Sequence, residues 1–217
     1  MNALDVSYPS ILLQLKKYIA FGRTESRAFL MWFLENYLRL DEVDATDAIC
    51  DGPDDKGIDG IYVDDNLEQV VILQGKLLQN ENRTLGDSQL KNFIGTLAQF
   101  GSPTQIAEVA QSTGNIELRN MITDSGLAEK VQKGYAITGI FVTNAPSDEN
   151  AKKYIASCSP TINLYDRQRL MDEYISSEPS SPQSAAVTFD LFGYGTIEYQ
   201  VGETKAVFAP SYLTQIR

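Results

Sequence analysis

The spacing of apolar residues changes several times along this chain of 217 residues, and each change marks a predicted element. Residues 8–20 have the spacing of a short helix, and Gly22 interrupts it. A longer helix is expected from Thr24, its N-cap residue, to about Leu40. The same spacing predicts further helices over 89–100, 103–111 and 116–133. The helix over 89–100 has its apolar residues in one stripe, and the helix over 116–133 is broken around Ser125-Gly126.

Strands are predicted where β-favouring residues run without helical spacing. A hairpin is expected around a turn at Asp64–Asn66, with its second strand over Val70–Leu73. The apolar run 135–144 has the length of a buried strand, and 162–165 is a shorter one. These two strands alternate with helices over 148–155 and 167–174, which Ser147 and Asp166 are expected to cap. This order predicts the parallel crossover of an α/β sheet.

The C-terminal part differs in composition from the rest. Residues 176–184 are rich in serine and proline, as linkers are, and 187–191 and 197–201 alternate as strands. So short a segment buries little core of its own. We therefore expect a domain over 1–176, a linker over 177–186, and either a β-hairpin extension or the start of a truncated second domain over 187–217.

Composition excludes several classes of protein. Hydrophobic residues make up 43% of the chain, but no apolar run approaches the roughly 20 residues that span a bilayer. Lys16 and Lys17 follow the first apolar stretch instead of preceding it, which argues against a signal peptide. Cys50 and Cys158 form neither a metal motif nor a disulfide framework, so a cytoplasmic location is expected. Because the chain has no histidine, it cannot supply Ser-His or Cys-His catalysis.

The hairpin carries the candidate chemistry. Asp59 opens its first strand, and Gln74 and Lys76 point to one face of the second, about 7 Å apart. If the strands pair, an acid, an amide and an amine converge at one end of the sheet. Mg²⁺ prefers such oxygen ligands, and with the amine they suit metal-assisted hydrolysis of a phosphodiester. The alternative is a surface hairpin whose polar residues are solvated.

The residues 55–60, Asp-Lys-Gly-Ile-Asp-Gly, followed by a strand that ends in Gln74-Gly75-Lys76, resemble the signature of Mrr-like nucleases. These belong to the PD-(D/E)XK superfamily, and the N-terminal nuclease domain of AIPR (abortive-infection phage-resistance) proteins is especially similar. The resemblance, over about residues 20–176, implies a restriction-endonuclease-like α/β core with a mixed central sheet flanked by helices. It implies Mg²⁺ or Mn²⁺ ligation by Asp59 and Gln74, with Lys76 at the attacking water. Gln74 replaces the commoner Glu, and Ile58 stands where the superfamily name has Pro.

Glu25 is the candidate for a further acid. On a helical wheel it lies within roughly 60° of Phe29, on the apolar side, whereas Glu35 falls about 120° away and is expected to face solvent. A carboxylate on an apolar face needs a partner. The resemblance implies that a helix acid completes the metal site; alternatively, Glu25 only stabilises the helix dipole. Weaker candidates for this role are Glu35, Asp44 and Asp47. Gln89, at the start of its helix, either touches substrate phosphate or is solvated.

Charge complicates a nucleic-acid function. The net charge is −11, and residues 41–65 hold ten acids against Lys56 alone. Duplex affinity comes largely from cations. We therefore expect weak DNA binding by this domain, aided by metal, by formation of a homodimer or by a missing module.

Two functions remain in view. The first is a metal-dependent endonuclease acting on DNA in anti-phage defence or restriction, and the second is a catalytically inactive nuclease-fold module for binding or assembly. A small-molecule enzyme with a Rossmann-like sheet is disfavoured because no glycine fingerprint follows any predicted strand.

Overall fold

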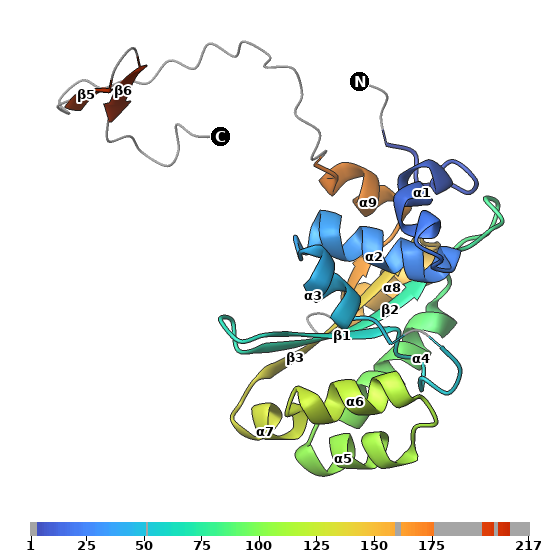
Figure 1. Cartoon of the computed structure of the whole chain (residues 1–217). Coiled ribbons are helices and arrows are strands. Elements are labelled where there is room, and N and C mark those ends of the chain that lie inside the picture. Colours follow the sequence, from blue (N-terminus) through green and yellow to red (C-terminus); the bar gives the residue numbers. More distant parts are fainter. Residues whose placement is uncertain (1–3, 51, 159–161, 176–196, 202–203, 209–217) are drawn as a thin grey trace. The chain divides into compact units, whose positions relative to one another are not determined.

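The computed structural model describes residues 4–50, 52–158, 162–175, 197–201 and 204–208. Contacts within the chain divide it into two units, residues 1–176 and residues 177–217. The larger unit contains the helices and the four-stranded sheet (Figure 1).

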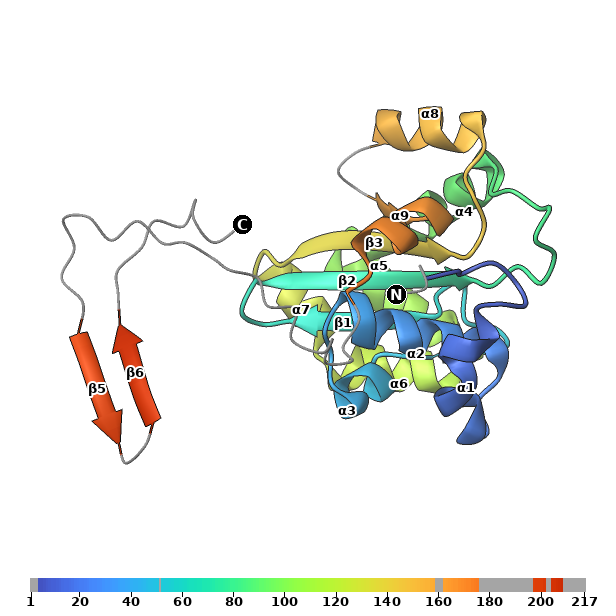
Figure 2. The same ribbon diagram turned by 90° about the horizontal axis from the view of Figure 1, so that it is seen from above.

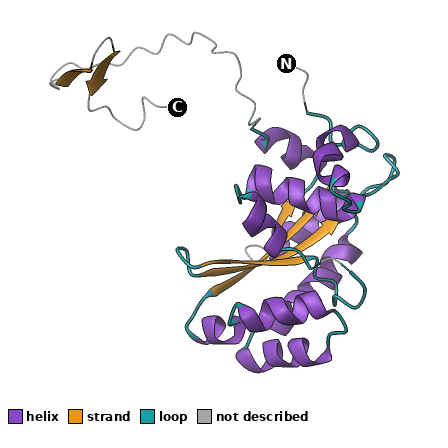
Figure 3. Ribbon diagram, in the orientation of Figure 1, coloured by secondary structure: helices purple, strands orange, loops and turns teal. Residues whose placement is uncertain are grey.

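A mixed sheet forms the centre of the larger unit (Figure 3). Its strands, β1 (Gly60–Asp64), β2 (Gln69–Lys76), β3 (Ala136–Thr143) and β4 (Ile162–Tyr165), lie in that order. β1 is antiparallel to β2, whereas β2, β3 and β4 are parallel to one another. The predicted hairpin, the parallel crossover and the α/β class with a mixed sheet between helices are therefore confirmed.

Helices cover both faces of this sheet because side chains alternate along its buried strands. Val71 and Leu73 of β2 pack in one core with the first helices, whereas Val70 and Ile72 pack in the other. The first face holds α1 (Leu12–Ala20), α2 (Glu25–Tyr37), α3 (Glu42–Asp47) and α9 (Arg167–Glu173). The second face holds α4 (Asp87–Leu97), the 3₁₀ turn η1 (Ala98–Phe100), α5 (Pro103–Ser112), α6 (Ile116–Asp124), α7 (Leu127–Gln132) and α8 (Glu149–Cys158). Figure 1 shows α2 and α5 on opposite sides of the sheet, and Figure 2 gives the view from above.

The middle of helix α2 is buried on all sides. Thr24 caps it as predicted, accepting a hydrogen bond from the Arg27 N–H at 3.2 Å, and every residue from Ala28 to Leu34 is buried. The predicted solvent exposure of Glu35 is wrong, since α1 packs against that side of α2. The Glu35 side chain is 17% exposed and accepts hydrogen bonds from Lys17 Nζ and Tyr18 Oη, both at 2.7 Å. A helical wheel describes one helix by itself and does not show which other helices pack against it.

Several boundaries differ from the expected ones. α1 begins at Leu12, and α2 ends at Tyr37. The acidic segment after α2 contains an unpredicted helix, α3, because the Asp41 carboxylate accepts from the N–H groups of Val43 and Asp44, both at 2.9 Å.

The expected cap of α8 is also corrected. The Asp148 carboxylate accepts from the Ala151 N–H at 2.8 Å, whereas the buried Ser147 hydroxyl has no partner among the described residues. Asp166 caps α9 as predicted, through the Arg169 N–H at 3.1 Å.

The smaller unit contains an antiparallel hairpin of β5 (Ile197–Val201) and β6 (Thr204–Phe208). The expected strand over 197–201 is confirmed, while the expected linker and the strand over 187–191 lie outside the described residues. None of the helices described here combines the length and the apolar character needed to cross a membrane.

Candidate active site

The loop before β1 places Asp59. The Asp55 carboxylate accepts from the Gly57 N–H at 2.8 Å, and the Ile58 N–H donates to the Asp55 carbonyl at 3.0 Å. The Ile58 side chain is completely buried in the core on the α4 side. Thr96 of α4 adds a hydrogen bond to the Lys56 carbonyl at 3.3 Å. Local turns and one buried anchor therefore fix where Asp59 enters the sheet.

Strand alternation is interrupted at Asp59. Gly60 is the ladder partner of Leu73, yet the Asp59 N–H also donates to the Leu73 carbonyl, at 2.9 Å. Two consecutive residues thus oppose one, as in a β-bulge, which re-aims a side chain. Gly60 is needed there because a Cβ would collide with the carbonyl oxygen of Ala48, across an isolated bridge to Ile49.

The Asp59 carboxylate lies against the end of β2. Its Oδ2 accepts a hydrogen bond from the Gly75 N–H at 2.7 Å, and the residue is half-buried. Oδ2 lies 3.8 Å from the position that a Cβ on Gly75 would take, and Leu30 Cδ1 of α2 lies 3.6 Å from the same position. Asp59 therefore leans toward the α2 side of the sheet edge.

Gln74 and Lys76 flank Gly75, so their side chains leave β2 on the opposite, α4 side. The Gln74 amide nitrogen lies 3.6 Å from the position of a Cβ on Gly57, beside the Thr96 hydroxyl. Lys76 is exposed, and no ion pair of its amine is found within the described part of the chain. Both residues pair with β3 on one edge and extend beyond β1 on the other.

Glu25 opens α2 and is half-buried. Its Oε2 accepts a hydrogen bond at 3.0 Å from Nε2 of Gln79, which follows the last residue of β2 by three positions. The start of α2 is thus joined to the segment that leaves the candidate site. Gln89 lies in the first turn of α4, and its Oε1 atom is buried with no hydrogen-bond partner among the described residues.

The structure brings Asp59, Gln74 and Lys76 to one end of the sheet, but their side chains point to different sides of it. Asp59 leans to one side, and Gln74 and Lys76 leave on the other. No three acidic or cysteine side chains of the described residues gather closely enough to hold a metal ion. Mg²⁺ is commonly held by one or two carboxylates together with water and substrate phosphate. The oxygen donors of Asp59, Gln74 and Glu25 fit that ion in kind.

Sequence reasoning missed two contributors to this region. Gly75 supplies the N–H that holds Asp59, and Gln79 holds Glu25. Gly75 had a signal, since a residue without a side chain between Gln74 and Lys76 leaves room for the approach of a carboxylate. Gln79 lies in an irregular segment, where no periodicity indicates its direction.

Comparison with known proteins identifies no relative of this chain. No family model, curated protein or solved structure matches the chain. The structure itself shows an α/β unit with a four-stranded mixed sheet between helices. The nuclease resemblance is therefore carried by the motif residues alone.

Proposed function

We propose that the chain is a metal-dependent endonuclease that hydrolyses DNA phosphodiester bonds. The observation that carries the proposal is the contact of the Asp59 carboxylate with the Gly75 N–H, between Gln74 and Lys76, at the end of a mixed sheet. An acid, an amide and an amine thus share one strand end that the hairpin partner does not cover.

Asp59, the amide oxygen of Gln74 and Glu25 are the residues that would hold Mg²⁺ or Mn²⁺. When bound, such an ion polarises a phosphoryl oxygen and lowers the pKa of its water. Asp59 is held in place by its hydrogen bond to Gly75, and Glu25 by its bond to Gln79. Ligands fixed in advance need less reordering when the ion arrives.

The remaining polar residues act on substrate. The exposed Lys76 amine supplies positive charge to a phosphate oxygen or orients the attacking water. Gln89, whose amide oxygen has no partner in the described structure, lies on the α4 side with Gln74 and contributes a donor to phosphate through its amide nitrogen. These are positioning and electrostatic roles, which dominate phosphoryl transfer.

The charge of −11 sets the conditions for DNA binding. Duplex affinity comes largely from lysines and arginines that neutralise phosphates, and an acidic chain offers few of them. We therefore propose that this domain binds DNA weakly by itself and gains affinity from metal or from a second copy of the chain. The resemblance to Mrr-like and AIPR proteins supports a role in anti-phage defence or restriction, and the two cysteines, which form no disulfide framework, support a cytoplasmic location.

The test is incubation of supercoiled plasmid with the purified chain and Mg²⁺ or Mn²⁺, beside Lys76→Ala. Lys153→Ala, an exposed lysine of α8, is the matched control. Nicking that needs metal, persists in Lys153→Ala and disappears in Lys76→Ala is expected. Equal nicking in all three samples indicates a contaminant and overturns the proposal, as does a wild-type chain that never cleaves.

A second candidate function is a catalytically inactive module that binds nucleic acid through the same fold. The observation that favours it is the division at the sheet edge, where Asp59 leans toward α2 and Gln74 toward α4. An electrophoretic shift of DNA that is unaffected by metal, without cleavage, would support this alternative over the nuclease.

A further inference from the structure

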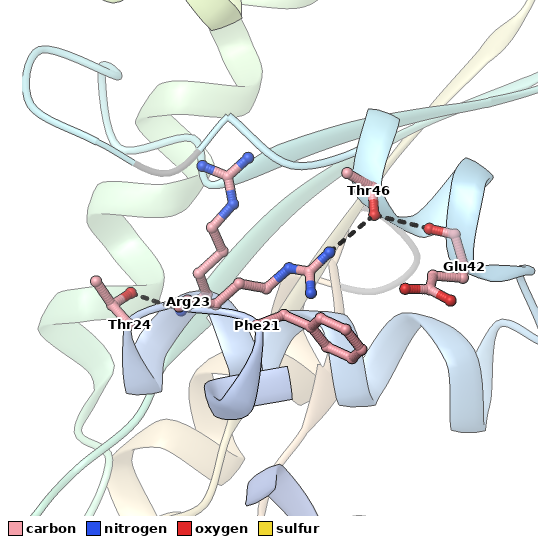
Figure 4. Close-up of a pocket in the computed structure, with 7 residues that line it drawn as sticks. Phe21, Arg23, Thr24, Glu42 and Thr46 are labelled. Atoms are coloured by element: carbon pink, nitrogen blue, oxygen red, sulfur yellow. Dashed lines mark hydrogen bonds between the residues drawn. The ribbon is translucent and has the colours of Figure 1, made fainter. Parts of the chain in front are cut away.

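A pocket of about 480 Å³ lies on the α2 side of the sheet, where the turn between α1 and α2 faces α3. Figure 4 shows Arg23 and Phe21 of that turn opposite Thr46 and Glu42 of α3. The lining residues are Phe21, Gly22, Arg23, Thr24, Arg27, Glu42 and Thr46. Arg27 and Glu25 are two residues apart in α2 and so face different sides of the helix, which separates this pocket from the candidate active site.

The pocket concentrates positive charge in an acidic chain. The Arg23 guanidinium donates to the Thr46 hydroxyl at 3.3 Å, and no carboxylate pairs with it in the described structure. Arg27 reaches Glu117 at 3.4 Å, but the Glu117 side chain is 55% exposed, so this pair is weak. The chain has 18 cationic and 29 acidic residues. Two arginines so lightly paired are therefore available to an anion.

An aromatic ring borders the same cations. Phe21 is 74% exposed, and the Arg23 guanidinium lies 6.0 Å from the centre of its ring. Exposing a ring of this size to water is unfavourable, and an open ring beside cations is how single-stranded nucleic-acid sites present a stacking surface for bases. The Thr24 hydroxyl lies at the N-cap of α2, where the helix dipole favours negative charge, whereas the Thr46 hydroxyl of α3 already donates to the Glu42 carbonyl at 2.7 Å.

We propose that this pocket binds a nucleotide, with its phosphate on Arg23 and Arg27 and its base stacked on Phe21. Arginine suits phosphate because its planar fork donates two parallel hydrogen bonds. The Glu42 carboxylate in the pocket wall repels free inorganic phosphate. It can also accept hydrogen bonds from the amino group of a base, so a base with an amino group is favoured. The ligand is either a free nucleotide or the 5′-phosphorylated end of a strand, and neither requires cleavage by the chain.

Calorimetric titration in the presence of EDTA tests the pocket without the metal site. Deoxyadenosine monophosphate is expected to bind more tightly than deoxyadenosine or inorganic phosphate. Arg23→Gln should weaken this binding roughly tenfold or more, as expected for one hydrogen bond to a charged group. Phe21→Ala should weaken the nucleotide and leave inorganic phosphate unchanged, whereas Glu42→Gln should strengthen phosphate.

Lys16→Gln, an exposed lysine of α1 outside the pocket, is the control for the change of charge. Equal affinities of Arg23→Gln and Lys16→Gln would overturn the proposal, and so would a nucleotide that binds no better than its nucleoside. An oligonucleotide with and without a 5′-phosphate separates the two sources. If the 5′-phosphorylated oligonucleotide binds more tightly than the mononucleotide, and Arg23→Gln removes the contribution of its phosphate, the strand end is the ligand. If the mononucleotide binds at least as tightly as the oligonucleotide, the free nucleotide is the ligand.

Discussion

The two ends of the β1–β2 hairpin carry similar residues in different surroundings. At the turn, Asp65 forms an ion pair with Lys130 and accepts a hydrogen bond from Tyr135 Oη at 3.0 Å. At the opposite end, Asp59 accepts from a backbone N–H, and Lys76 has no ion pair within the described part of the chain. We name these regions the turn end and the strand end of the hairpin.

The pKa values at the turn end show what mutual pairing does. The hydrogen bond from Lys130 lowers the pKa of Asp65, and the Asp65 carboxylate raises the pKa of both Lys130 and Tyr135. Each shift favours the form that the group already has at neutral pH, so the cluster is stable as it stands. At the strand end, none of the described residues pairs with the Lys76 amine, so its charge is available to an external anion. The comparison distinguishes a structural cluster from a candidate site.

The largest expected effect comes from changing the acid at the strand end. Asp59→Asn keeps an oxygen for the Gly75 N–H but removes the charge that a metal needs, so cleavage should fall by up to ~1000-fold. Asp65→Asn is the matched change at the turn end and should leave cleavage unaltered. Plasmid nicking rates of the two variants measure the contrast. Equal losses would show that the two ends do not differ in function.

Glu25 tests whether the site extends to α2. Glu25→Gln preserves the volume and the hydrogen-bonding capacity toward Gln79, yet should lower cleavage by ~100-fold if Glu25 is a metal ligand. Glu149→Gln, an acid in the first turn of α8, is the control, because both variants lose a helix-dipole interaction of about 0.3–1 kcal/mol. If both variants cleave normally and melt slightly earlier, Glu25 serves its helix alone.

Metal binding should stabilise the fold through the strand end and not through the turn end. At a hundredfold excess of Mg²⁺ or Mn²⁺ over the dissociation constant, the gain should be about 2.7 kcal/mol. Asp59→Ala should remove most of this gain, and Asp65→Ala should keep it. Thermal melting with and without metal measures this gain. A wild-type melting temperature that neither ion changes would contradict a metal site at Asp59.

Sequence alone predicted the elements better than their surroundings. The hairpin, the Thr24 cap and the parallel crossover followed from alternation, capping chemistry and element order, which are local signals. α3 had a local signal as well, in Asp41 before a short acidic turn. The environment of Glu35 had none, because it depends on how α1 packs against α2.

The candidate site shows the same limit. Alternation correctly placed Gln74 and Lys76 on one side of β2, but the direction of Asp59 depends on two residues that oppose Leu73. Beside them, Gly60 closely approaches the Ala48 carbonyl, a contact between segments that the sequence does not pair. Residue types at a site are thus readable from sequence, and their directions require the fold.

The smallest expected effect concerns the pH dependence of the turn end. The pKa of Asp65 is lowered from 3.8, so its contribution to stability is present above that value and is lost as the pH falls through the folded-state pKa. The pKa of Lys130 is raised from 10.5, so its contribution is lost only as the pH rises beyond that value.

The difference in urea midpoint between the wild type and Asp65→Asn should therefore be constant from about pH 5 to 9 and shrink in acid. It should also shrink with added salt, because the pair is exposed. A difference that persists at full size in acid would mean that Asp65 acts through its shape and not its charge.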